Sequence, residues 1–150
     1  MWWPTEFQPR LSPVGAEENT TQPANQRLKS TRLALASKAD IVLDLHCDHD
    51  GSRYLYLHER LLDAGRQLAQ ALHAAAILTD AGTDPFSFVL KVDERWTEEC
   101  LENDTRFSAT VEMRGMIDVT ADLAEHDAQA LYRYLVDIGT VRDSFARACE

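Results

Sequence analysis

Residues 39–48, Ala-Asp-Ile-Val-Leu-Asp-Leu-His-Cys-Asp, decide the fold class of this 150-residue chain. The segment is largely apolar up to Leu45 and then ends in polar residues, which is typical of a strand buried in an α/β sheet. Ligands of such sheets bind beyond the carboxyl ends of the strands. We therefore expect functional side chains to gather around His46.

A second strand is predicted at residues 107–113, Phe-Ser-Ala-Thr-Val-Glu-Met, because this pattern suits a central strand that ends in a polar edge. Since side chains alternate across a strand, Asp44 and His46 point to the same face of the first strand. The two strands thus bring ionisable residues together at their ends. These residues are Asp44, His46, Asp48, His49 and Glu112.

The rest of the chain predicts helices and short strands around these two segments. Apolar residues recur at helical spacing in three segments, and two short apolar runs favour further strands. The predicted helices cover residues 26–38, 59–75 and 121–138, and the predicted strands cover residues 54–57 and 76–79. The predicted apolar faces are Leu28, Thr31 and Leu35 on the first helix, and Ala124, Ala128, Leu131, Leu135 and Ile138 on the last.

Two stretches lack any sustained period. Residues 80–104 contain Gly82, Pro85 and many charges, so we expect a long surface loop with one turn of helix near Trp96. Residues 1–25 carry four of the five prolines, which predicts an irregular or disordered leader. The chain is thus expected to divide into residues 1–25, an α/β domain over residues 26–142, and a tail over residues 143–150.

The composition excludes several classes of partner. With 25 acidic and 15 basic residues, the net charge of −10 repels nucleic acid and anionic lipid, so we expect neither as a partner. No apolar run reaches the roughly 18 to 20 residues that span a bilayer, and we expect a cytoplasmic protein. The three cysteines include no Cys-x-x-Cys pair, which argues against a disulfide framework and a zinc ribbon. Cys47 is expected to be a buried, unreactive thiol.

His46 and Glu112 are the candidates for metal chemistry. A neutral imidazole is a good zinc ligand, and a nearby carboxylate can accept a proton from water whose pKa the cation has lowered to about 7. A histidine that follows a strand is more often a surface or hydrogen-bonded residue, and this alternative stays open. A second alternative is a local cation site formed by His46, Asp48, His49 and Asp50.

Residues 39–48 resemble the segment of the succinylglutamate desuccinylase/aspartoacylase family that carries its second zinc-binding histidine. The later run Thr-Val-Glu-Met-Arg-Gly, residues 110–115, is similar to the strand that bears the family's general-base glutamate. These proteins are relatives of the zinc carboxypeptidases. The similarity extends from about Leu28 to Val141, and the order and separation of the two motifs agree with it.

The resemblance implies a partial zinc-carboxypeptidase-like domain over residues 26–142, with three α/β/α layers and a mixed sheet. It implies that His46 is a ligand of Zn²⁺, that Glu112 is the catalytic base, and that Arg114 contacts a substrate carboxylate. The implied activity is that of a zinc-dependent hydrolase, a deacylase, desuccinylase or amidohydrolase. Its substrate would be a small N-acyl or ester-type molecule.

The resemblance also predicts that the chain is a fragment with an incomplete metal site. The family takes its first two zinc ligands from an upstream His-x-x-Glu arrangement, and no His-x-x-Glu occurs in this sequence. A partial sheet leaves apolar helix faces uncovered, so we expect poor solubility and a tendency to form oligomers. The alternative function is a non-catalytic binding or regulatory module that keeps part of the fold.

Overall fold

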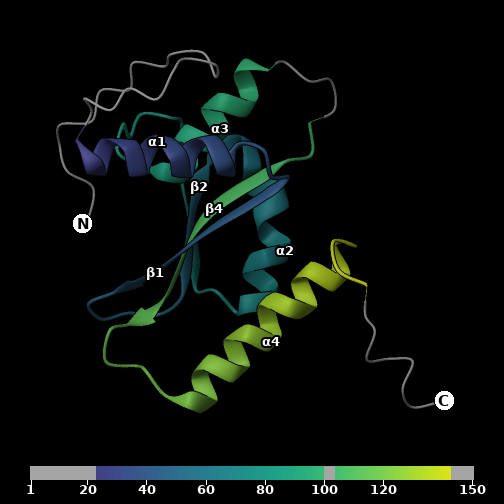
Figure 1. The fold of residues 1–150 in the computed structure, drawn as a ribbon. Coiled ribbons are helices and arrows are strands. Elements are labelled where there is room, and N and C mark those ends of the chain that lie inside the picture. Colours follow the sequence, from purple (N-terminus) through teal and green to yellow (C-terminus); the bar gives the residue numbers. More distant parts are fainter. Residues whose placement is uncertain (1–22, 100–103, 143–150) are drawn as a thin grey trace.

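The structure is a computed structural model that describes residues 23–99 and 104–142 (Figure 1). The predicted tail and nearly all of the predicted leader therefore lie outside the described residues. In chain order the elements are α1 (Ala24–Ala36), β1 (Ile41–Asp48), β2 (Tyr54–His58), the 3₁₀ helix η1 (Glu59–Leu61), α2 (Leu62–Leu72), β3 (Ala76–Asp80), α3 (Phe88–Glu98), β4 (Phe107–Gly115) and α4 (Ala121–Asp137). None of the helices in this described part is long and apolar enough to cross a membrane.

The described strands form one mixed sheet in the order β1-β4-β2-β3. Strand β1 pairs with β4 in parallel, β2 pairs with β4 antiparallel, and β2 pairs with β3 in parallel. The four predicted strands are all present, and β1 and β4 lie side by side although they are far apart in the sequence. This order places β1 and β3 at the two edges of the described sheet.

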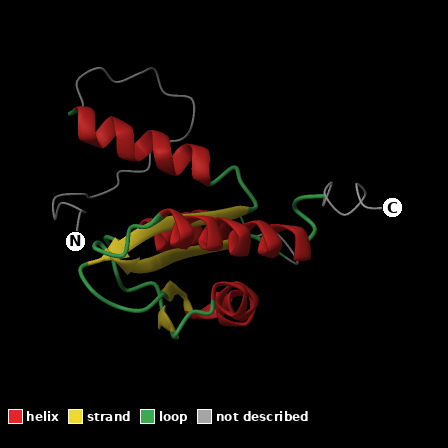
Figure 2. Cartoon of the chain, turned by 90° about the horizontal axis from the view of Figure 1, so that it is seen from below, coloured by secondary structure: helices red, strands yellow, loops and turns green. Residues whose placement is uncertain are grey.

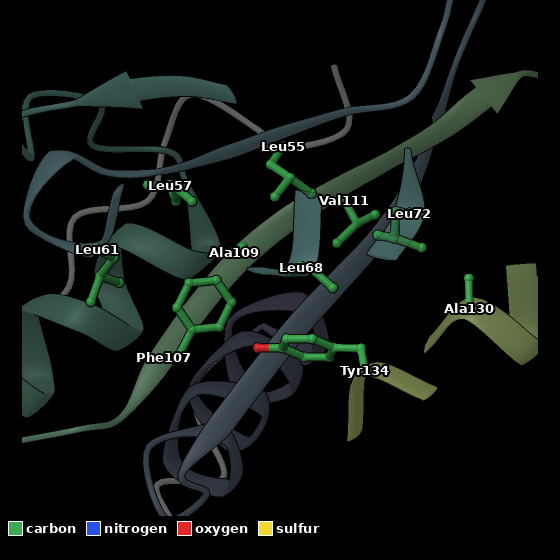
Figure 3. Close-up of a cluster of buried hydrophobic side chains, with 10 residues drawn as sticks. All are labelled: Leu55, Leu57, Leu61, Leu68, Leu72, Phe107, Ala109, Val111, Ala130 and Tyr134. Atoms are coloured by element: carbon green, nitrogen blue, oxygen red, sulfur yellow. The ribbon is translucent and has the colours of Figure 1, made fainter. Parts of the chain in front are cut away.

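Helices cover both faces of the sheet (Figure 2). Helices α2 and α4 pack on one face and complete a first core cluster with β2 and β4 (Figure 3). The buried residues of this first cluster are Leu55, Leu57, Leu61, Leu68, Leu72, Phe107, Ala109, Val111, Ala130 and Tyr134. Helices α1 and α3 build a second cluster with β1, made of Leu33, Val42, Val92 and Trp96. The predicted three-layer α/β/α domain with a mixed sheet is confirmed.

Strand β4 is buried on both faces, as expected for a central strand. Its side chains toward α2 and α4 belong to the first cluster and are Phe107, Ala109 and Val111. On the opposite face, the Ser108 hydroxyl donates a hydrogen bond of 3.1 Å to the Val89 carbonyl of α3. Because side chains alternate along a strand, Glu112 follows Ser108 onto the face of the sheet that α3 covers.

The prediction of a surface loop over residues 80–104 is wrong, because helix α3 occupies much of this segment. The Ser87 hydroxyl caps the helix by accepting a hydrogen bond from the Leu90 N–H. Trp96 is fully buried, and its indole N–H donates to the Ser37 carbonyl at 2.9 Å. The buried spacing of Val89, Val92 and Trp96 is helical, but the many charges between these residues hide it.

The predicted apolar face of the helix over residues 26–38 is also wrong. Leu28 and Leu35 are 62% and 64% exposed, and Leu33 is instead the buried residue. Helix α1 contacts the described part of the chain mainly through α3, so only a narrow stripe of it is covered. The spacing of Leu28, Thr31 and Leu35 therefore identifies a helix but not its buried side.

The predicted apolar face of α4 is confirmed in part. Three of its residues pack against the first cluster, namely Leu131, Leu135 and Ile138. Two are exposed, namely Ala124 and Ala128, while the buried positions are Asp127, Ala130 and Tyr134. The apolar pattern cannot reveal Asp127, whose burial is tolerated because arginines pair with it.

The burial of Trp96 leads to a prediction about the α1/α3 layer. Replacing Trp96 with alanine removes the largest buried side chain and the hydrogen bond to Ser37, so the free energy of unfolding should fall by about 3 to 5 kcal/mol. Urea titration followed by circular dichroism measures this change. The matched control, Leu28→Ala in exposed α1, should change it by less than about 0.5 kcal/mol. Equal effects of the two substitutions would contradict the packing of α3 described above.

Candidate active site

The parallel pairing of β1 and β4 brings His46 directly opposite Glu112. The His46 Nδ1 atom lies 3.7 Å from the Glu112 Oε1 atom. Both side chains stand near the carboxyl ends of their strands, on the sheet face toward α3. Two predicted site residues that are distant in the sequence therefore face one another.

Asp44 fixes the orientation of the His46 ring. The His46 Nε2 atom lies 3.0 Å from the Asp44 Oδ2 atom, and Arg32 approaches the other oxygen of Asp44 at 3.4 Å. An ionised carboxylate can only accept a hydrogen bond, so this contact places the imidazole proton on Nε2. The lone pair of Nδ1 then faces the side of Glu112, which is the arrangement that a metal-binding histidine requires.

Glu112 is a largely buried carboxylate with spare hydrogen-bonding capacity. Its side chain is 16% exposed, and its buried Oε2 atom has no hydrogen-bond partner in the described part of the chain. Burial raises the pKa of Glu112, Asp48 and Asp44 raise it further by charge repulsion, and His46 opposes them. A carboxylate with an increased proton affinity and a free oxygen is suited to accept a proton from a ligand beside it.

Tyr54 is a site residue that sequence reasoning missed. It lies opposite Glu112 in the antiparallel pairing of β2 and β4, and its hydroxyl donates to Asp48 at 3.3 Å. Burial and the neighbouring charges of Glu112 and Asp48 raise the pKa of the Tyr54 phenol, so it stays a hydrogen-bond donor. The strand that contains Tyr54 is predictable from sequence, but its pairing with β4 leaves no local signal.

A shift in the register of β1 and β4 separates Arg114 from this cluster. His46 pairs with Glu112, but Asp48 pairs with Gly115, so β4 carries an additional residue at this point. Such a bulge redirects the side chains that follow it. The Arg114 guanidinium forms a bidentate ion pair with Asp127 of α4. The contact of Arg114 with a substrate carboxylate stays a prediction.

Asp127 joins three elements behind the site. Arg53, immediately before β2, donates to Asp127 at 3.0 Å, and Arg114 of β4 contacts both of its oxygens. Burial raises the pKa of Asp127, but the hydrogen bonds and charge of Arg114, with the charge of Arg53, outweigh burial and leave the pKa below its ordinary value. The cluster thus anchors α4 to β2 and β4.

The described residues form no complete metal site. Within residues 23–99 and 104–142, no group of three or more histidine, cysteine, aspartate or glutamate side chains is placed to hold a metal ion. The Nδ1 atom of His46 fits a metal ligand, and the unpartnered Oε2 atom of Glu112 fits a base beside the metal. A zinc site needs about three or four ligands, so these residues could supply only part of one.

Two other expectations about this region fail or stay unsupported. Cys47 is exposed, contrary to the prediction of a buried thiol, because β1 lies at the edge of the described sheet. The local cation site that the sequence suggested next to His46 also gains no support. His49 is almost fully exposed, and within the described residues its ring forms an ion pair only with the neighbouring Asp48.

Solved structures share this fold. No protein-family model and no curated protein matches the sequence. A candidate succinylglutamate desuccinylase/aspartoacylase from Shewanella frigidimarina is 23% identical with a TM-score of 0.63, over 81% of this chain and 34% of that chain. A candidate protein of the same family from Shewanella amazonensis is 25% identical with a TM-score of 0.61, over 79% of this chain and 33% of that chain.

These likenesses confirm the predicted resemblance to succinylglutamate desuccinylase/aspartoacylase structures at the level of the fold. The chain spans about a third of the length of the structures that it matches, as expected for a fragment of such a fold.

The buried carboxylate of Asp127 leads to a second prediction. Asp127→Asn leaves two poorly exposed arginines without their anion, so the free energy of unfolding at pH 7 should fall by about 3 kcal/mol. Glu125→Gln, which removes an exposed charge from the same helix, is the matched control and should change little. Denaturant titrations of the three proteins make the comparison.

The loss of stability that Asp127→Asn causes should depend on pH. Because the pKa of Asp127 is lower in the folded chain than its ordinary value, its stabilisation is fully present above about pH 4 and is lost as pH falls through the folded pKa. The stability difference between the parent chain and Asp127→Asn should therefore shrink below pH 4. A difference that stays constant over that range would contradict the ion-pair assignment.

Proposed function

We propose, from the fold that this chain shares with succinylglutamate desuccinylase/aspartoacylase structures, that it carries part of the active site of a zinc-dependent hydrolase. The reaction would be the hydrolysis of an amide or ester bond in a small acylated molecule. The observation that carries this proposal is the pair of His46 and Glu112, with Nδ1 and Oε1 3.7 Å apart at neighbouring strand ends.

His46 would hold the zinc ion through Nδ1, with Asp44 keeping the ring in place through Nε2. The chemistry that zinc supplies when bound is the acidification of a water molecule and the polarisation of the substrate carbonyl. Glu112 would accept the proton of that water and return it to the leaving nitrogen or oxygen. The raised pKa of Glu112 supports both steps, because a base must release its proton as well as take it.

Other residues would shape the pocket around this pair. Tyr54, held by Asp48, would present a phenol hydroxyl close to the Glu112 carboxylate. Arg114, which the register shift separates from this pair and Asp127 holds in place, would contact a substrate carboxylate through its remaining guanidinium donors. The negative charges of Asp44, Asp48 and Glu112 favour a bound cation at this end of the sheet.

Zinc affinity gives the first test of this proposal. With one histidine ligand the isolated chain should bind zinc weakly, and His46→Ala should weaken binding by roughly ten-fold or more, in line with the loss of a ligand contact. His49→Ala, which removes an exposed histidine three residues away, should leave the affinity unchanged. Competition with a chromogenic zinc chelator measures all three proteins. Equal affinities for the parent chain and His46→Ala would exclude His46 as a ligand.

Glu112→Gln tests the proposed base. The substitution keeps the shape of the side chain but removes its basicity, so zinc-dependent hydrolysis of a chromogenic acetyl ester should fall by about 100-fold or more. Zinc affinity should change much less than it does in His46→Ala. A Glu112→Gln chain that keeps the parent rate would show that the hydrolysis does not use Glu112. A parent chain that neither binds zinc nor hydrolyses the ester would show that this chain alone is a metal-free fragment or a non-catalytic module.

A further inference from the structure

Strand β3 forms the edge of the described sheet that lies farthest from β1. Among the described strands, β3 pairs only with β2. The Ala75 N–H, directly before β3, donates a hydrogen bond of 2.7 Å to the Arg53 carbonyl, which identifies the side of the strand that faces β2. Since the hydrogen-bonding side alternates with each residue of a parallel strand, the backbone groups of Ala76, Leu78 and Asp80 face outward.

Little protects this edge against the addition of another strand. Native edge strands tend to carry lysine, proline or exposed charges. Strand β3, Ala-Ile-Leu-Thr-Asp, has neither lysine nor proline, and the carboxylate of its one charged residue, Asp80, accepts hydrogen bonds from the N–H and the hydroxyl of Thr83 in the following turn. Ile77 packs against the first core cluster, so Leu78 points to the opposite face of the sheet. The Leu78 side chain is 49% exposed there.

Helix α2 provides a second contact surface beside this edge. It packs on both β2 and β3. Neighbouring strands lie about 4.8 Å apart, so a second copy of β3 paired across the edge would bring its own α2 to about 10 Å from the first α2. This is the distance between packed helices. Pairing of the two strands would therefore also pack the two helices.

This surface is nearly neutral in an acidic chain. Residues 62–79, which span α2 and most of β3, contain only two charged residues, Asp63 and Arg66, and these form an ion pair of 3.4 Å. The whole chain carries a net charge of −10, so two copies repel each other less through this surface than through an average part of the chain. Its exposed, uncharged residues include Ala64, Gln67, Gln70, Ala75, Ala76 and Thr79.

We propose that the edge of β3 and the adjoining side of α2 bind a second copy of this chain, in a two-fold symmetric dimer whose sheet runs through both copies. An antiparallel pairing centred on Leu78 fits the outward backbone groups, because Leu78 then forms a hydrogen-bonded pair with its own counterpart and Ala76 lies opposite the second copy's Asp80. No charged residue of β3 opposes another in this register. Strand β2 separates this edge from His46 and Glu112, so the dimer does not depend on the proposed function.

Sedimentation velocity of the full 150-residue chain over a wide range of concentrations should show a monomer–dimer equilibrium. Leu78→Lys would place two lysines opposite each other and should raise the dissociation constant of the dimer by about ten-fold or more. The matched control, Leu28→Lys, adds the same charge at a position of α1 that is 62% exposed and should leave the dissociation constant unchanged. Because Leu78 faces its own counterpart, mixing Leu78→Lys with Leu78→Glu should restore the dimer. Circular dichroism checks that all variants keep the fold.

Hydrogen exchange identifies the strand that pairs. The amides of Ala76 and Leu78 should exchange about ten-fold or more slowly in the dimer, whereas the Ile77 amide, which faces β2, should be equally protected in both states. A chain that stays monomeric would overturn the proposal, as would a dimer that Leu28→Lys weakens as much as Leu78→Lys. A dimer that leaves Ala76 and Leu78 unprotected would also overturn it. Failure of the Leu78→Lys and Leu78→Glu chains to associate when mixed would overturn the register centred on Leu78.

Discussion

The parallel pairing of β1 with β4 is the interaction on which the rest of the structure depends. Strand β4 is buried on both faces and pairs on both sides, so its position is set by the core rather than by any single contact. That position places Glu112 opposite His46 on one side and opposite Tyr54 on the other. The site is therefore built by backbone register, and its side chains need no long loop to bring them together.

A central strand can hold a carboxylate in an electrostatically unfavourable position. The Glu112 carboxylate lies near the charges of Asp44 and Asp48, and one of its oxygens has no hydrogen-bond partner among the described residues, which costs free energy in a folded chain. The extensive pairing and packing of β4 hold the carboxylate there against this cost. Behind the site the arrangement is the opposite, because the Asp127 carboxylate forms ion pairs with both Arg53 and Arg114. The unpartnered oxygen of Glu112 thus lies where a cation is proposed to bind.

The sequence predicts strands β1 and β4 well because buried strands leave short apolar runs with polar ends. It fails for α3, where Lys91 and Glu94 interrupt the pattern and where Asp93 is buried against Arg60. Alternation along a strand places Asp44 beside His46, but only the tertiary structure pairs Tyr54 with Glu112. Pairings between distant segments and charges buried in ion pairs leave no periodic trace, so these parts of the site could not be predicted.

The distance along the chain between β1 and β4 has a consequence for folding kinetics. Ile41 pairs with Phe107, so β1 cannot find its only described neighbour until most of the chain has been synthesised. Contacts of such long sequence separation form slowly, because the loop between them must first be closed. During synthesis on the ribosome, the edge of β1 that pairs with β4 would stay open until residues 107–115 have been made. Residues 39–48 would therefore be a suitable binding segment for a chaperone that shields extended apolar chain.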